Sequence, residues 1–151
     1  MGHEKTLTSM LPALAGSNII YGMGMLEMGM TMSYEQLLID QEIVRMIRRV
    51  LQGIAVNKET IALDVIKGVG ASGNYLSESH TRLNMRKESS QARLIDRKMR
   101  DGWEKDGSKD IAERANEEAK KILENYKPLP LDIKAAKVIR EIILEAEEEL
   151  L

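Results

Sequence analysis

The spacing of apolar residues predicts helices along most of the chain. Apolar residues three and four positions apart predict a helix over about Glu4–Ala15, disturbed by Pro12, and a long amphipathic helix over Tyr34–Gln52. Ser33 and Gln36 have the spacing of a capping box at the start of the second helix. The apolar stripe expected to face the core comprises Ile39, Ile43, Met46, Ile47, Val50 and Ile54.

Further helices are predicted in the second half of the chain. The residues expected to cap their N-termini are Asn57, Ser108 and Asp132. The first of these helices covers Lys58–Lys67, and the polar, glycine-punctuated stretch that follows is mostly loop, with helix around His80. The second continues to Tyr126, where two prolines end it, and the third runs towards the C-terminus.

One short segment departs from the helical pattern. Asn18–Tyr21 is β-prone and is closed by Gly22 and Gly24, which predicts a buried strand running into a loop. An unpaired buried backbone group costs on the order of 1–3 kcal/mol, and the rest of the sequence offers no evident partner strand. Either the segment is not a strand, or its neighbouring strands lie outside this polypeptide.

Composition narrows the class of protein. The 151 residues suffice for one domain, but aromatic content is only 3%, which is low for a self-sufficient core. A net charge of −2 gives no general attraction to nucleic acid or to an anionic membrane, and the N-terminal segment is too short and too polar for a signal peptide or a membrane span. The absence of cysteine excludes disulfides and thiolate sites and fits a reducing compartment, so we expect a cytoplasmic protein.

A glycine- and methionine-rich stretch follows the predicted strand. Gly22 and Gly24 begin a dinucleotide-binding pattern, but the third glycine would fall at Glu27; a glycine-rich turn at the carboxyl end of a barrel strand is the alternative. The methionines either fill an irregular surface or form a soft pocket wall around an apolar or cationic small molecule, which Glu27 would face as a carboxylate. They are Met23, Met25, Met28, Met30 and Met32.

Other candidate chemistry is sparse. His3 and His80 lie far apart without metal-ligand spacing, so we expect no metal site, and no Ser-His-Asp arrangement can be assembled. A locally basic segment is either a solvated face or a docking surface for an acidic partner. It contains Arg82, Arg86, Lys87, Arg93, Arg97, Lys98 and Arg100.

Several longer motifs carry a family resemblance. They are G-H-E-K at Gly2–Lys5, L-A-G-S-N-I-I-Y-G-M-G-M-L-E at Leu14–Glu27, S-Y-E-Q-L-L-I-D at Ser33–Asp40, G-N-Y-L with H-T at Gly73–Thr81, and W-E-K-D-G-S-K-D with E-R-A-N at Trp103–Asn116. Together they resemble the C-terminal part of the trimethylamine:corrinoid methyltransferase family, over nearly the whole chain. The match corresponds to about the last third of such a protein, downstream of the pyrrolysine position.

The resemblance implies an α/β protein of TIM (β/α)8 barrel type. The chain would be the C-terminal portion of the barrel, itself predominantly α-helical with one or two short strands, and residues 104–151 would form a C-terminal helical extension of the 1–151 fragment. Family members transfer a methyl group from trimethylamine or a related methylated amine to the cobalt of a cognate corrinoid protein, in methanogenesis from methylamines. Pyrrolysine, encoded by an amber codon, lies a little before the position matching Gly2. The catalytic residue would therefore be missing, and we expect the fragment to be inactive alone.

The same resemblance implies a substrate site on the glycine- and methionine-rich loop. The residues expected to bind the methylated amine are Tyr21, Gly22, Gly24 and Glu27. Relatives that use glycine betaine tend to carry a histidine after the strand, where this chain has Gly22, which favours the trimethylamine branch. The D-x-H-x-x-G corrinoid-binding pattern does not occur, so the corrinoid would be carried by the partner protein and no cofactor bound directly.

Two further expectations complete the interpretation. Exposed barrel edges would favour homo-oligomers, because unpaired strand edges seek partners. The alternative functions are a stand-alone helical interaction module, which binds a corrinoid protein or a methyltransferase through Arg82–Arg100, and a translation remnant with no independent role.

Overall fold

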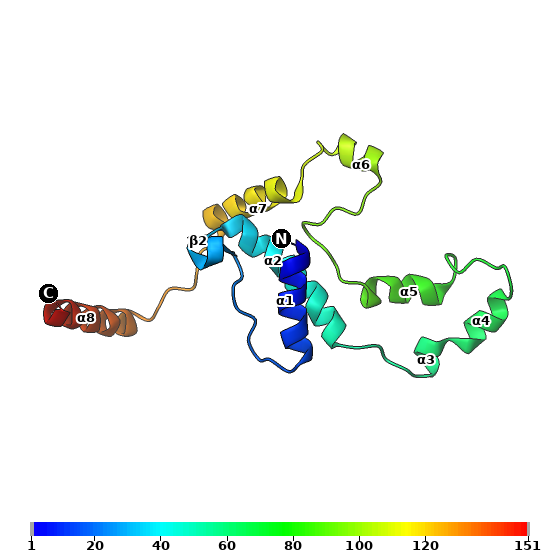
Figure 1. The fold of residues 1–151 in the computed structure, drawn as a ribbon, viewed down its shortest axis with the longest axis horizontal. Helices are drawn as coiled ribbons and strands as arrows, with labels where there is room; N and C mark the ends of the chain where they lie inside the picture. The colour runs from blue at the N-terminus through cyan, green and yellow to red at the C-terminus, as the bar shows by residue number, and fades with distance from the viewer. Residues whose placement is uncertain (1, 151) are drawn as a thin grey trace. The chain divides into compact units, whose positions relative to one another are not determined.

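The structure, a computed structural model, describes residues 2–150 and consists of helices and one small hairpin (Figure 1). In chain order the elements are α1 (Gly2–Leu14), β1 (Met25–Leu26), the 3-10 turn η1 (Glu27–Gly29), β2 (Thr31–Met32), α2 (Tyr34–Leu51), α3 (Lys58–Ile61), α4 (Leu63–Val69), α5 (Ser79–Glu88), α6 (Arg100–Lys105), α7 (Ile111–Asn125) and α8 (Ile133–Leu150). The chain divides into a first unit that ends at Lys120 and a second that begins at Lys121.

Helices α1 and α2 pack together and form the core of the first unit. The buried apolar residues of this α1–α2 cluster are Ala13 from α1 with Ile43 and Ile47 from α2, while Leu94, Ala115 and Ala119 are buried elsewhere in the first unit. Met10, Ile20 and Met46 pack against this cluster while partly buried. The long helix predicted over Tyr34–Gln52 is thus confirmed, but its stripe is shorter than expected, because Val50 is exposed and Ile54 lies beyond the end of α2.

The strand predicted at Asn18–Tyr21 is wrong for this structure, because the segment is irregular and Ile19 and Tyr21 are exposed. A strand needs a neighbour to accept its backbone hydrogen bonds, and none lies beside this segment in the described part of the chain. The two short strands lie later, where β1 and β2 pair antiparallel with Met25 opposite Met32. The expectation of a predominantly helical chain with short strands is confirmed; a barrel around it stays a prediction.

The hairpin turns through left-handed backbone at three successive residues. Glu27, Met28 and Gly29 have φ values of 53°, 54° and 91°. This conformation is disfavoured for residues with a side chain, so the turn is held by contacts elsewhere in the hairpin. Thr31 Oγ1 donates one such bond to Glu27 Oε2 at 2.8 Å.

The middle of the chain has more breaks than its pattern predicts. Asn57 caps α3 as expected, its Oδ1 accepting from the N–H groups of Glu59 and Thr60. The single helix predicted over Lys58–Lys67 is in fact two, because Ala62 adopts a left-handed φ of 51° between α3 and α4. The helix expected around His80 is present as α5.

The start of α7 also differs from the prediction. Its cap is Asp110, whose Oδ1 accepts from the Glu113 N–H at 2.8 Å, while Glu113 Oε2 accepts from the Asp110 N–H at 2.9 Å. This reciprocal pair satisfies two free N–H groups, whereas Ser108, the predicted cap, lies in a left-handed turn before it. The short helix α6 had no predicted counterpart.

The second unit contains the C-terminal helix α8. Asp132 caps it as predicted, with Oδ2 accepting from the N–H groups of Lys134 at 3.1 Å and Ala135 at 3.2 Å. None of the residues Ile133–Leu150 is buried. Over residues 2–150, no helix combines the length and apolar character needed to cross a bilayer.

Candidate functional site

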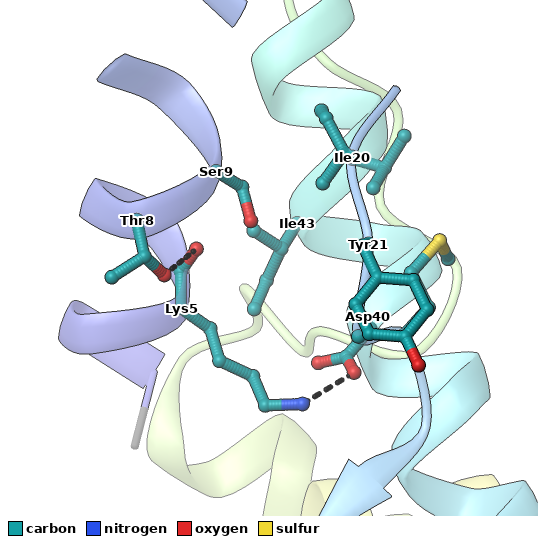
Figure 2. A pocket seen from close by; sticks show the side chains of 10 residues that line it. Lys5, Thr8, Ser9, Ile20, Tyr21, Asp40 and Ile43 are labelled. Carbon is teal, nitrogen blue, oxygen red and sulfur yellow. Dashed lines mark hydrogen bonds and ion pairs between the residues drawn. The ribbon is translucent and has the colours of Figure 1, made fainter. Parts of the chain in front are cut away.

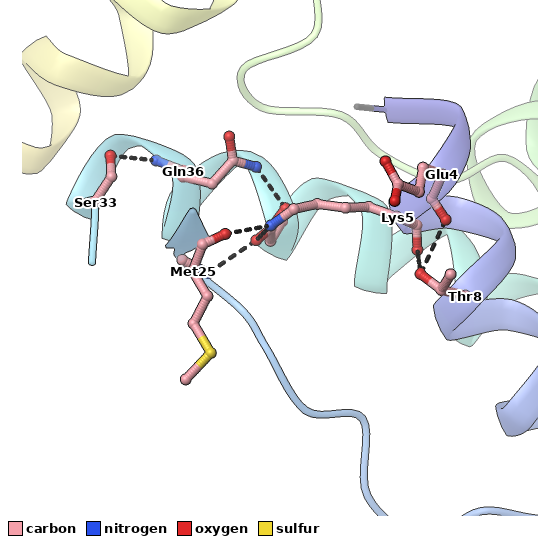
Figure 3. Close-up of polar contacts among 8 residues, drawn as sticks. Glu4, Lys5, Thr8, Met25, Ser33 and Gln36 are labelled. Carbon is pink, nitrogen blue, oxygen red and sulfur yellow. Dashed lines mark hydrogen bonds and ion pairs between the residues drawn. The ribbon is translucent and has the colours of Figure 1, made fainter. Parts of the chain in front are cut away.

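A buried carboxylate joins three parts of the first unit. Asp40 on α2 is 4% exposed and accepts hydrogen bonds from three directions. The donors are the Gly24 N–H at 2.8 Å, Gln36 Nε2 at 2.6 Å and Lys5 Nζ at 2.6 Å. The contact between Lys5 and Asp40 is also an ion pair. Lys5 Nζ donates in addition to the carbonyl oxygen of Met25 at 3.3 Å (Figure 3). We call this set of four contacts the Asp40 clasp.

The local sequence explains why the clasp forms. Gln36 and Asp40 are four residues apart on α2 and therefore lie on the same helix face. Ser33 Oγ caps α2 by accepting from the Gln36 N–H at 3.1 Å, so the predicted cap is confirmed. The other half of the capping box is absent, because the Gln36 side chain turns to Asp40 and the Ser33 N–H donates to the Gly24 carbonyl at 2.9 Å.

Gly24 bonds to Asp40 at a position where a side chain on residue 24 would have no space. A Cβ there would lie 2.7 Å from Met32 Cε and 3.1 Å from Leu37 Cβ, and the φ of +75° is itself unfavourable for residues with a Cβ. Both backbone polar groups of Gly24 are bonded, its N–H to Asp40 and its carbonyl to the Ser33 N–H. Glycine at this position thus lets the loop approach α2 closely.

A small cavity lies beside the clasp, between α1, α2 and the segment that leads to β1 (Figure 2). Its volume is about 130 Å³. The polar part of its wall includes Lys5, Ser9 and Asp40, and the apolar part includes Ile20 and Ile43. A hollow with mixed walls and one buried ion pair is suited to a small, partly polar molecule.

The predicted substrate-binding residues lie in two places. Tyr21 and Gly22 line the cavity, although the Tyr21 side chain is 83% exposed. Gly24 contributes its N–H to the clasp, and Glu27 lies on the exposed hairpin turn, where its carboxylate accepts from Thr31. A role of these four residues in substrate binding stays a prediction.

The residues that sequence reasoning missed are the polar ones on α2 and α1. Gln36, Asp40 and Glu42 are buried, although they lie on a helix interpreted only through its apolar stripe. The available signal was the four-residue spacing of Gln36 and Asp40 next to a helix start. The partner Lys5 had no local signal, because it comes from 35 residues away.

The methionines of the glycine- and methionine-rich stretch lie partly at the cavity and partly on the hairpin. Met23 lines the cavity, and Met25 receives the Lys5 ammonium at its carbonyl oxygen. Met28 and Met30 are exposed on the hairpin. The soft pocket wall considered from the sequence therefore applies at most to the first part of the stretch.

A second buried carboxylate on α2 holds a different segment. Glu42 is 3% exposed, accepts from the backbone N–H of Arg93 at 2.8 Å and pairs with Arg45 at 2.9 Å. Glu42 follows Asp40 by two residues, so the two side chains leave the helix about 200° apart. Glu42 is thus chemically similar to Asp40 but contacts no part of the loop or cavity described above.

Two carboxyl groups nearer the surface have shifted proton affinities. The pKa of Glu35 is lowered by its own backbone N–H, the Ser33 hydroxyl and the Asn116 amide, which lies 2.6 Å from Glu35 Oε1. The pKa of Asp96 is lowered by the Lys98 N–H, and further by Arg114 at 2.7 Å. Both carboxylates therefore link segments of the first unit in their charged form.

Two residues of the basic segment form ion pairs with acidic residues that follow it in the chain. Lys98 pairs with Asp106, and Arg100 pairs with Glu104 at 2.7 Å.

His80 Nε2 lies 2.9 Å from the Glu59 carbonyl oxygen, as a structural histidine would. Within residues 2–150, no group of three or more histidine, aspartate or glutamate side chains could hold a metal ion.

Comparison with known proteins gives a consistent result. The family model described as trimethylamine methyltransferase (MTTB) matches residues 1–150. Trimethylamine methyltransferase MttB of Desulfitobacterium hafniense is 54% identical over 97% of this chain and 29% of its own length. Trimethylamine methyltransferase MttB2 of Methanosarcina mazei is 47% identical over 97% of this chain and 29% of its own length.

A relative named for a different substrate is less similar. The glycine betaine methyltransferase of Desulfitobacterium hafniense is 33% identical over 99% of this chain and 31% of its own length. The chain thus spans less than a third of the length of these curated relatives. With a family match along almost all of its residues, the chain belongs to the trimethylamine methyltransferase (MTTB) family.

Proposed function

We propose that this chain is part of an enzyme that transfers a methyl group from trimethylamine to the cobalt of a separate, cognate corrinoid protein. The observation that carries the proposal is the family match over residues 1–150, together with 54% identity to a relative named trimethylamine methyltransferase. Identity to the glycine betaine methyltransferase is lower, at 33%, which supports trimethylamine as the amine. The corresponding metabolism is methanogenesis from methylamines.

The loop and cavity would hold the amine. Tyr21 would offer an aromatic face and Met23 a polarisable surface to a methylated ammonium, and Glu27 would supply a negative charge from the hairpin. Gly22 leaves space at the cavity wall for the methyl groups. These residues would orient the methyl carbon and exclude water, while the cobalt of the partner protein accepts the methyl group.

The rest of the proposal concerns what surrounds this segment. Ile19 is exposed here, and the neighbouring strands of a TIM barrel would cover it in the whole protein. We place the protein in the cytoplasm, self-associated, with the corrinoid bound by its partner.

The test compares the whole protein with this segment. The full-length protein that contains it is mixed with reduced corrinoid protein and trimethylamine, and methylation of cobalt is followed by absorbance. We expect methylation that depends on trimethylamine for the whole protein, no methylation with glycine betaine, and none by the 151-residue chain alone. Turnover by the isolated chain, or no turnover by the whole protein, would contradict the proposal.

The loop is tested by one substitution with a matched control. Glu27→Gln in the full-length protein removes the charge that would face the ammonium, so we expect a higher KM for trimethylamine. Glu124→Gln, an exposed change on α7, serves as the control and should leave the kinetics unchanged. Unchanged kcat and KM in Glu27→Gln would remove this residue from the site.

The interaction-module alternative has less support. Lys98 and Arg100 of the basic segment already pair within the chain, which reduces the charge available to an acidic partner. The isolated chain mixed with the corrinoid protein distinguishes the two functions. Tight binding without turnover, lost on changing Arg82 or Arg86 to glutamine, would favour the module.

A further inference from the structure

We propose that Asp40 is the positioning residue of the substrate loop: its buried carboxylate fixes the backbone at Gly24, and thereby the Tyr21–Gly22 wall of the cavity. Asp40 acts through other residues and is not expected to contact the reacting atoms. The inference rests on the proposed function for its catalytic consequence. The clasp itself stands on the geometry alone.

The first argument is the number and origin of the donors. Lys5 comes from α1, Gly24 from the loop and Gln36 from α2, and all three donate to one carboxylate within 2.8 Å. A carboxylate that is 4% exposed is tolerated only when donors replace its lost hydration. Moving the loop away would remove one of these donors and would leave the buried Gly24 N–H without its partner.

The second argument is the position of the anchor relative to the cavity. Gly24 lies only two residues after Gly22 and three after Tyr21, and these two residues form part of the cavity wall. Lys5 and Asp40 line the same cavity (Figure 2). A displaced anchor would therefore shift the wall that is expected to orient the methylated amine.

The third argument is that the loop has few other anchors. Ile19, Tyr21, Met28 and Met30 are exposed in this structure. Besides the clasp, the bond from the Ser33 N–H to the Gly24 carbonyl at 2.9 Å holds the same residue. The polar attachment of the loop to α2 is thus concentrated at Gly24, and Ile20 adds an apolar contact with the core.

The clasp is tested first in the 151-residue chain by amide hydrogen exchange followed by NMR. Asp40→Asn keeps the size of the side chain but turns an NH₂ group towards one of the three donors. We expect the Gly24 amide to exchange at least about tenfold faster in this variant, because its acceptor is lost or displaced. Glu42→Gln is the matched control, and it should speed exchange at Arg93 while leaving Gly24 unchanged.

The positioning role is then tested in the full-length protein by methyl transfer from trimethylamine. We expect Asp40→Asn to lower kcat by about a hundredfold, the scale of a misplaced catalytic geometry, with a smaller change in KM. Lys5→Met is a milder variant and should lower kcat about tenfold, whereas Lys5→Arg should recover most of the activity because a guanidinium can still pair with Asp40. Glu42→Gln should keep the wild-type kcat.

The outcomes separate this inference from the proposed function. Equal Gly24 exchange in the wild type and in a folded Asp40→Asn variant would overturn the clasp. Faster exchange with unchanged kcat would overturn the positioning role, and so would equal losses in Asp40→Asn and Glu42→Gln. If the full-length wild type transferred no methyl group, the proposed function would fail, and the Gly24 exchange rates would still decide on the clasp.

Discussion

Helices α2 and α8 have the same length, 18 residues, and both are amphipathic, yet only α2 has a buried face. Ile43 and Ile47 of α2 pack against Ala13 of α1, whereas none of the residues of α8 is buried. The difference shows that an apolar stripe identifies a helix without identifying what covers it. Coverage depends on another element of the chain, or on a partner, reaching the stripe.

The polar residues of the two helices differ as well. Gln36, Asp40 and Glu42 are buried on α2, each held by groups from its own helix or from distant segments. On α8, Lys137 and Glu141 form an exposed pair at 3.7 Å. Polar groups therefore fix the packing of α2 in one arrangement, while those of α8 interact mainly with water.

The largest expected effect comes from the two apolar stripes. Ile47 is 1% exposed, so Ile47→Ala should lower the free energy of unfolding of the first unit by about 2–5 kcal/mol. Ile139 on α8 is 47% exposed, and Ile139→Ala should change the free energy of unfolding by less than about 0.5 kcal/mol. Urea denaturation followed by circular dichroism measures both. Similar losses in the two variants would mean that α8 is packed as tightly as α2.

An intermediate effect is expected from the two helix caps. Ser33→Ala removes the acceptor of the Gln36 N–H and should lower the free energy of unfolding of the first unit by about 1 kcal/mol. Asp132→Ala should instead reduce the helical signal of α8 and leave the denaturation midpoint of the first unit unchanged. A lower denaturation midpoint of the first unit in Asp132→Ala would show that the stability of α2 depends on α8.

The smallest effect is expected from pH. The lowered pKa values of Glu35 and Asp96 mean that both groups release protons more readily in the folded state. Their contribution to stability is therefore complete above the unfolded-state pKa, near pH 4, and is lost as pH falls through the folded pKa values. Urea midpoints at pH 7 and pH 3 should differ less in Glu35→Gln and Asp96→Asn than in the wild type. If the midpoints at pH 7 and pH 3 differed as much in the variants as in the wild type, the two carboxylates would not contribute to the pH dependence of stability.

Most of the local features of the fold were predictable, although Ser108 does not cap α7 as expected. The caps Ser33, Asn57 and Asp132 each bond backbone groups within a few residues, and all three are confirmed. The break at Ala62 was not predictable, because an alanine at φ 51° has no local signal. The strand expected at Asn18–Tyr21 failed for a different reason: its β propensity is real, but a strand also requires a neighbour.

The candidate site was predictable only in part. The sequence indicated the loop of Tyr21 and Gly22, and the structure places both beside a cavity. It gave no indication of the pairing between Lys5 and Asp40, because an ion pair across 35 residues depends on how α1 and α2 pack. A charged residue on an amphipathic helix is usually solvated, and Asp40 departs from that expectation through its three donors.

The exposed turn of the hairpin is one place where this chain is open to oxidation. Met28 and Met30 carry their thioethers on the outside of the loop, whereas Met10 and Met46 pack against the core. Peroxide should therefore convert Met28 and Met30, together with the similarly exposed Met99, to sulfoxides before Met10 and Met46, at little cost to stability. In a protein kept under air, part of the early damage would fall on the stretch proposed to hold the amine, and methionine sulfoxide reductases would be expected to repair it.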